Sequence, residues 1–86
     1  MQNLKGRHAA VVDVARYFEY EHLPNRLREV SKAVHDLAQE MIDTLPDCPM
    51  LTRGLNTLLG AKDEFVRAAL PAARQLAEDE KPAVDA

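Results

Sequence analysis

Apolar residues recur every three or four positions along two stretches of the chain, and this spacing limits the fold more than any other feature. In the first stretch these residues are Leu27, Val30, Val34, Leu37, Met41 and Leu45. In the second stretch they are Leu51, Leu55, Leu58, Phe65 and Ala69. The spacing places each set on one face of an α-helix. No alternating strand pattern and no internal repeat occur elsewhere in the sequence, so we predict an all-α fold.

Prolines mark the ends of the predicted helices. Pro24 and Asn25 predict the start of the first long helix, because proline suits a first turn and asparagine is a favourable N-cap. Leu45 predicts its end, because the residue before a proline avoids the helical conformation. The stretch "LPDCPML" then forms a tight turn with two prolines. Two helices of similar length joined by a short turn are expected to pack as an antiparallel helical hairpin.

The regions outside the hairpin are predicted to be shorter or less regular. Residues 7–18 have the spacing of a short helix, and "EYEHLP" after them is typical of an extended connection. Pro71 interrupts the second helical pattern and should kink the helix or split off a last short one. Residues 78–86 are acidic and poor in apolar side chains, which predicts a flexible tail. We therefore expect a single domain over residues 1–77.

Length and charge narrow the range of functions. A chain of 86 residues has a marginal core, so self-association is the expected supplement. Residues 1–77 carry ten cations and ten carboxylates, whereas binding to a DNA or RNA polymer calls for a basic surface. No apolar run approaches the roughly 18 residues of a membrane span, and no signal peptide is recognisable. Together with the single cysteine, Cys48, these features predict a cytoplasmic protein that contacts neither a membrane nor a nucleic acid polymer.

Residues that often carry catalysis or bind metals are scattered along the chain. His8, His22 and His35 lie far apart and lack acidic neighbours at metal-ligand spacing. Cys48 lies in the two-proline turn without the partners of a catalytic nucleophile. No glycine-rich phosphate loop follows a strand. We predict no bound metal, no cofactor and no enzymatic activity.

Three residues of the second stretch depart from a regular helical pattern. Lys62 stands where an apolar residue is due, and we interpret it as a side chain that reaches solvent from the edge of the apolar face. Gly54 and Gly60 each cost roughly 1 kcal/mol relative to alanine within a helix. They are either tolerated weaknesses or positions where another backbone or a ligand approaches closely.

Aromatic and basic residues gather around the start of the first long helix. Arg28, Lys32 and His35 lie at positions i, i+4 and i+7, so they share one ridge beside the apolar face. Tyr20 precedes them on the connection. A ring that stacks on a base, cations that bind phosphate and the positive end of a helix suggest a site for a small anionic nucleotide. The alternative is that Lys32 pairs with Asp36, Arg28 is solvated, and Tyr20 only fastens the connection to the hairpin.

Three segments, "FEYEHLP", "LREVSKAVHDLAQEMIDTLPDCP" and "LLGAKDEFVRAAL", resemble a phage family, the anti-CBASS cyclic-oligonucleotide sponges. The small helical-hairpin domain of that family is shared with sponges that counter the Thoeris defence. The resemblance covers residues 18–70. It implies a protein that binds cyclic di- or trinucleotide immune signals without cleaving them. It also implies a compact homo-oligomer, typically a hexamer, with ligand pockets between subunits.

The entry to the first long helix is one part of the resemblance. Tyr20 would correspond to a tyrosine that stacks on the ligand, in an aromatic-x-Tyr-His-Pro-Pro-like motif. His22 and Pro24 belong to the same motif, so the resemblance includes them among the ligand-binding residues. Arg28 would correspond to the phosphate-binding cation, or Lys32 would if the shorter connection shifts the register.

The second helix supplies the other part. Arg67 would match an arginine at which the family is thought to build a separate site for cyclic trinucleotides. The chain departs from the family pattern by an inserted Glu21, by Leu23 in the entry, and by Gly60 and Lys62 in the second helix. Two other functions therefore stay open. One is a sponge for a cyclic ADP-ribose-type Thoeris signal, and the other is a helical oligomerisation or protein-binding module with no nucleotide ligand.

Overall fold

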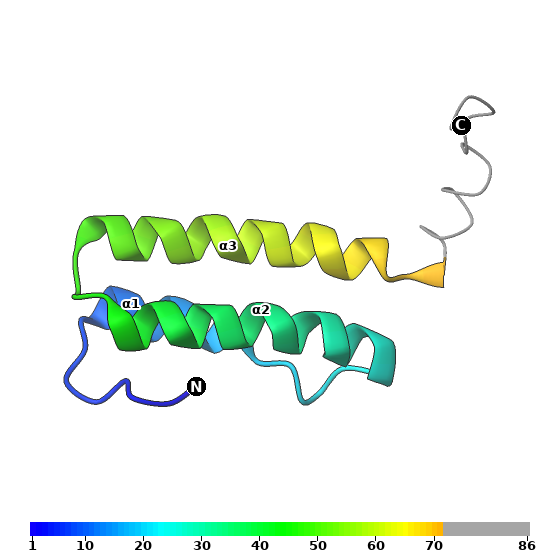
Figure 1. Cartoon of the computed structure of the whole chain (residues 1–86), viewed down its shortest axis with the longest axis horizontal. Helices are drawn as coiled ribbons and strands as arrows, with labels where there is room; N and C mark the ends of the chain where they lie inside the picture. The colour runs from blue at the N-terminus through cyan, green and yellow to red at the C-terminus, as the bar shows by residue number, and fades with distance from the viewer. Residues whose placement is uncertain (72–86) are drawn as a thin grey trace, which may run out of the picture.

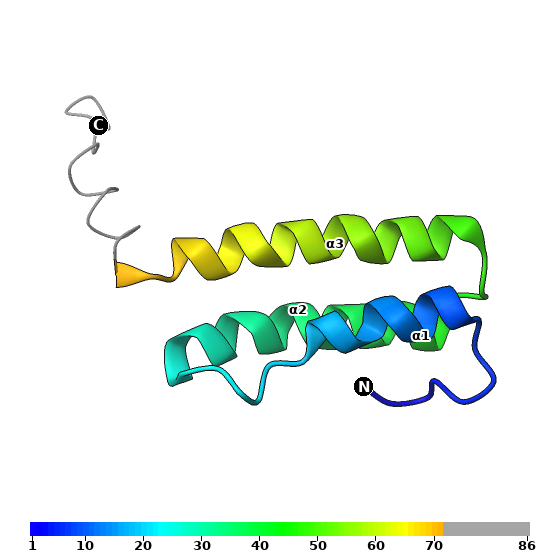
Figure 2. The same cartoon turned by 180° about the vertical axis from the view of Figure 1, so that it is seen from behind.

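The computed structural model describes residues 1–71, and every regular element within them is a helix. The elements are α1 (Ala9–Ala15), the short 3-10 helix η1 (Arg16–Phe18), α2 (Asn25–Thr44) and α3 (Pro49–Ala68). The two long helices lie side by side and run in opposite directions, as Figure 1 shows, and Figure 2 shows α1 on the other side of the pair. The predicted all-α class is confirmed for this part of the chain. The predicted acidic tail, residues 78–86, and whatever follows Pro71 lie outside the described residues.

The helix ends follow the prolines, with one exception. Leu45, the residue after α2, has an extended backbone (φ −109°, ψ 148°), and Pro49 lies in the first turn of α3. The exception is Asn25, which we expected to cap α2. Pro24 is the N-cap residue, its backbone is extended, and no side chain caps the helix there. The prediction for Asn25 is wrong because the fixed φ angle of Pro24 already ends the extended connection, which leaves Asn25 inside the first turn.

The first helical region is shorter than the predicted 7–18. Regular α-helix covers Ala9–Ala15, and the next three residues tighten into η1 before the chain extends at Glu19. Phe18, the last residue of η1, has no exposed surface. It joins a core of nine buried apolar residues from all four elements. These are Val11, Val14, Ala15, Phe18, Val34, Ala38, Ile42, Leu51 and Leu55.

The buried face of α2 is not the predicted one. We expected Val34, Leu37 and Leu45 to share the core, yet only Val34 is buried, and the other two are 45% and 43% exposed. The buried residues of α2 are Ser31, Val34, Ala38 and Ile42. The buried face of α2 is rotated about the helix axis relative to the predicted one because η1 packs against this helix. The small side chains of Ser31 and Ala38 permit that close approach.

Residues 1–8 form an irregular segment with a turn at residues 5–6, and it lies along α2, which the sequence pattern did not predict. Gln2 exchanges hydrogen bonds with Gln39, and the Asn3 side chain donates to Asp43 over 2.9 Å. At the end of the segment, the Arg7 guanidinium contacts the carboxylate of Asp47 and two backbone carbonyls at the end of α2. The segment therefore fastens the start of the chain to the whole length of the second half of α2.

Ser31 is a weak point in the core. The residue is fully buried, and its hydroxyl has no hydrogen-bond partner among the described residues. An unpaired buried hydroxyl costs free energy, so Ser31→Ala is expected to raise the free energy of unfolding by about 1 kcal/mol. Denaturation in urea measures the change. The matched control is Thr57→Ala, which removes an exposed hydroxyl and should change stability by less than about 0.5 kcal/mol. A less stable Ser31→Ala protein would show that the hydroxyl has a partner.

Candidate functional site

The connection between η1 and α2, residues 19–24, is stabilised by hydrogen bonds to its own backbone carbonyls. The amide of Leu23 donates to the carbonyl of Tyr20 over 3.1 Å, which forms a turn. Arg28 Nε donates to the Leu23 carbonyl over 3.1 Å. Phe18 anchors one end of the connection in the core, and Pro24 begins α2 at the other. Arg28 is therefore exposed, as the alternative interpretation expected, and its guanidinium also holds the connection through the Leu23 carbonyl.

Tyr20, Lys32, His35 and Asp36 form a side-chain cluster, called the α2 cluster below. The rings of Tyr20 and His35 meet edge to face, with centroids 4.9 Å apart and planes at 63°. Lys32 Nζ donates to Asp36 Oδ2 over 2.8 Å, and His35 Nδ1 lies 3.1 Å from Asp36 Oδ1. The pairing of Lys32 with Asp36 is confirmed, as the alternative interpretation expected. The Tyr20 ring and the Lys32 ammonium nevertheless belong to the same cluster.

The charge of the α2 cluster is nearly balanced. The hydrogen bond from Lys32, followed by that from His35, lowers the pKa of Asp36 below its usual 3.8. The same carboxylate raises the pKa of Lys32 above its usual value. Asp36 is thus ionised and neutralises Lys32. An anionic ligand would have to displace the Asp36 carboxylate from Lys32.

A cavity of about 300 Å³, called the entry pocket below, lies on the other side of the connection. Its lining residues are Tyr17, His22, Leu23, Leu59, Lys62, Asp63 and Val66. It joins the connection to α3. It also brings one predicted site residue, His22, next to a cation from the distant helix.

Lys62 fixes the geometry of the entry pocket. Its Nζ donates to the backbone carbonyl of Tyr17 over 2.6 Å and to that of Glu19 over 3.3 Å. Partial burial lowers the pKa of Lys62, and the nearby Glu19 carboxylate opposes this shift. The interpretation of Lys62 as a side chain at the edge of the apolar face holds in part, because the side chain is only partly buried and its ammonium also bonds to two backbone carbonyls. Its ammonium binds the carbonyls at the end of η1, which helix geometry leaves without a partner.

The structure divides the predicted site residues among several places. Tyr20 and Lys32 lie in the α2 cluster, and His22 lies in the entry pocket. Arg67 belongs to neither, because it is 72% exposed and pairs with Asp63 over 3.1 Å. Asp63 lines the entry pocket, which places Arg67 one helical turn away from that cavity. Sequence reasoning missed Lys62 as a member of this region, although its position within the apolar pattern was the available signal.

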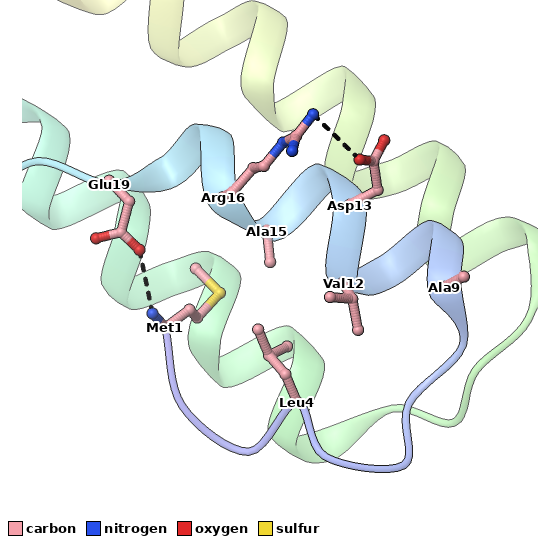
Figure 3. A pocket seen from close by; sticks show the side chains of 8 residues that line it. All are labelled: Met1, Leu4, Ala9, Val12, Asp13, Ala15, Arg16 and Glu19. Atoms are coloured by element: carbon pink, nitrogen blue, oxygen red, sulfur yellow. Dashed lines mark hydrogen bonds and ion pairs between the residues drawn. The ribbon is translucent and has the colours of Figure 1, made fainter.

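A cavity of about 640 Å³ lies between the N-terminal segment and α1, as Figure 3 shows. Leu4 and Val12 are among its apolar lining residues. Two ion pairs border it, Arg16 with Asp13 at 3.4 Å and the Met1 ammonium with Glu19 at 3.2 Å. None of the six predicted ligand-binding residues lines it. The apolar lining suits an apolar group better than a phosphate.

Residues 1–71 contain neither a candidate metal site nor a helix that could span a membrane. No group of three or more histidine, cysteine, aspartate or glutamate side chains within residues 1–71 is placed to hold a metal ion. No helix in the same range has both the length and the apolar character required to cross a membrane. The chain matches no protein-family model, and no curated protein or solved structure is significantly similar to it. The resemblance to the sponge family therefore stays a prediction.

Proposed function

We propose that the protein is a phage anti-defence sponge that binds cyclic di- or trinucleotide immune signals without cleaving them. Sequestration of the signal in the cytoplasm of the host cell would prevent activation of CBASS effectors. The observation that carries the proposal is the α2 cluster, in which the partly buried Tyr20 ring is held beside His35 and Lys32. The resemblance over residues 18–70 supplies the ligand class.

The α2 cluster provides the two contacts that a nucleotide needs. A tyrosine ring that stacks on a base contributes about 1–3 kcal/mol. Lys32 provides a point charge for a phosphate, and Arg28 holds the connection so that Tyr20 stays in place. The ligand phosphate replaces the Asp36 carboxylate at Lys32, so part of the electrostatic gain is offset by this exchange. One such half-site is weak, and a nanomolar dissociation constant, about −12 kcal/mol, requires contacts from more than one subunit.

The proposal therefore includes a homo-oligomer of the antiparallel hairpin, with a hexamer as the stoichiometry that the resemblance implies. His22 and Pro24 complete the entry motif beside Tyr20. In the same proposal, Arg67 belongs to a separate site for cyclic trinucleotides, as the resemblance implies. A cyclic ADP-ribose-type signal is the second ligand candidate, because it offers the same combination of a base and phosphates.

A thermal-shift screen of the full chain against cyclic dinucleotides, cyclic trinucleotides and cyclic ADP-ribose tests the proposal. We expect at least one cyclic nucleotide to raise the melting temperature, and the unmodified ligand to be recovered after the protein is denatured. Tyr20→Ala should abolish the shift. The matched control is Tyr17→Ala, because Tyr17 is the other tyrosine of the chain and its ring already lies 5.2 Å from the Arg16 guanidinium.

Each result of the screen has a defined meaning. If no ligand raises the melting temperature, the sponge proposal is wrong, and a binding or oligomerisation module without a nucleotide is favoured. If Tyr17→Ala abolishes the shift while Tyr20→Ala does not, the ligand occupies the entry pocket and the assignment to the α2 cluster is wrong.

Asp36→Asn provides a gain of function, because removal of the competing carboxylate should tighten binding about two- to fivefold.

A further inference from the structure

The side of the α2–α3 pair that faces away from α1 is apolar and uncovered by the described residues. A groove of about 270 Å³ lies there, and no residue of α1 or of the N-terminal segment lines it. Figure 1 shows α1 behind the pair, with no described segment crossing in front of it. The lining residues are Leu37, Met41, Leu45, Met50, Leu51, Gly54, Leu55 and Leu58. All of them are apolar or glycine.

Helical spacing extends the groove into a larger surface, called the open face below. One row follows α2 and the other follows α3. The α2 row is Val30, Ala33, Leu37 and Met41, continued by the C-cap residue Leu45, and the α3 row is Met50, Gly54, Leu58, Ala61 and Phe65. None of these ten residues is charged, although 29% of the chain is. On the open face, Leu37, Leu45, Met50 and Phe65 are 45%, 43%, 71% and 53% exposed, so a large part of the apolar surface contacts solvent.

The open face also has a protrusion and a hollow on the same helix. A Cβ atom added to Gly54 would meet no atom of the described chain within 4 Å. Met50, one turn earlier on the same row, is the most exposed large apolar residue among residues 1–71. Under a two-fold axis, the same surface patch meets itself, and such a surface must hold both a protrusion and its complement. Met50 and Gly54 meet that requirement.

We infer that the open face is the surface through which two copies of this chain pair. Two 20-residue helices lying side by side present a face of about 30 Å by 20 Å. The projected area, roughly 600 Å², becomes larger when the relief of the side chains is included, and a stable dimer needs about 800 Å² per partner. Because the open face carries no charge, it needs no partner of opposite charge, and a second copy of the same face can pair with it. The chain is also short enough to need added burial.

The α2 cluster lies outside the open face, so pairing leaves Tyr20 and Lys32 accessible. Lys32 and Asp36 are each 54% exposed on α2 and fall outside its apolar row. The inference gives the proposed homo-oligomer one interface, and the ligand pocket between subunits then requires a second interface at the α2 cluster. The inference does not rest on nucleotide binding. Its test is the mass of the ligand-free protein, so it can fail while nucleotide binding holds, and the reverse.

Two glycine variants test the inference without disturbing the fold. Gly54→Gln and Gly60→Gln both replace glycine with a better helix former, and a Cβ at either position meets open space. Gly60 lies six residues further on, which turns it about 120° around the helix and away from the open face. Sedimentation equilibrium of the full chain without ligand should show a dimer or larger assembly for the wild type. Gly54→Gln should weaken the pairing at least tenfold, and Gly60→Gln should not.

A charge variant gives an independent measurement. Leu37→Glu places a carboxylate in the open face and should produce a monomer. Val12→Glu is the matched control, because Val12 is a similarly exposed apolar residue (39%) that lies on α1. A wild type that stays monomeric throughout its soluble concentration range would overturn the inference and leave the face to a different protein. Equal pairing of the two glycine variants would overturn it as well.

Discussion

Phe18→Ala is expected to lower the free energy of unfolding by about 3–5 kcal/mol, which is among the largest losses that a single core truncation produces. Phe18 has no exposed surface and is the largest fully buried side chain among residues 1–71. It lies at the end of η1, where it packs the short helical region against the long helices. The cavity left by the ring cannot be filled by neighbouring residues without moving η1. Because domains of this size have little stability to spare, a large fraction of the variant should be unfolded at room temperature.

The second phenylalanine of the chain provides the matched control for this experiment. Phe65 is 53% exposed, so Phe65→Ala should cost less than about 1 kcal/mol in the isolated chain. Urea denaturation followed by circular dichroism, at a concentration low enough to keep the protein monomeric, separates the two variants. Equal losses for the two would contradict the burial of Phe18. Loss of Phe18 also frees the connection that carries Tyr20, so this variant is unsuitable as a test of ligand binding.

The helix ends could be predicted from the sequence because local chemistry determines them. The extended backbone of Leu45 follows from its position before Pro46. The helix α3 begins at Pro49, earlier than the predicted turn over residues 45–51 allowed, because proline lacks the amide that a first turn does not use. The identity of the helices likewise follows from the spacing of apolar residues. These signals act within a few residues, and no partner far away in the sequence was needed to find them.

The rotation of α2 could not be predicted, because it depends on distant segments. Leu37 and Val34 are both apolar, and contacts with segments distant in the sequence, η1 among them, decide which of the two is buried. The N-terminal segment binds α2 through contacts that span 35 to 40 residues of sequence. Such contacts leave no periodic trace in the sequence. The predicted apolar row of α2 is in fact divided between the core and the open face.

The same distinction holds for the candidate site: contacts between residues close in the sequence were predictable, and contacts between distant residues were not. The pair of Lys32 and Asp36 follows from i, i+4 spacing, and it was considered from the sequence. The bonds from Lys62 to the carbonyls of Tyr17 and Glu19 cross more than 40 residues and could not be foreseen. Gly54 shows a third case. Close approach of another backbone or a ligand was one of two interpretations, and within the described chain nothing approaches Gly54, so that interpretation requires a ligand or a second copy.

Arg7→Met is the second substitution with a large expected effect, and it tests whether the N-terminal segment belongs to the fold. The Arg7 guanidinium donates to the carbonyls of Ile42 and Leu45, which the end of α2 leaves without helical partners. It also pairs with Asp47 over 2.6 Å. Hydrogen bonds from a charged donor are stronger than neutral ones, so we expect a loss of about 2 kcal/mol. For a domain of this size, that loss lowers the melting temperature by roughly 10 °C.

Arg26→Met is the matched control, because Arg26 is an exposed cation in the first turn of α2, where the helix dipole does not favour positive charge. It should change stability by less than about 0.5 kcal/mol.

Acid titration gives a second readout. The amide of His8, followed by Arg7, lowers the pKa of Asp47 below its usual 3.8. The stability that comes from this carboxylate is present above pH 3.8 and is lost as the pH falls through the lower pKa in the folded protein. The wild type should lose stability there more steeply than Arg7→Met, because methionine leaves only the His8 amide to hold the carboxylate. If Arg7→Met and Arg26→Met had equal melting temperatures and equal acid profiles, the N-terminal segment would not be docked on α2. The rotation of α2 would then have to be explained by η1 alone.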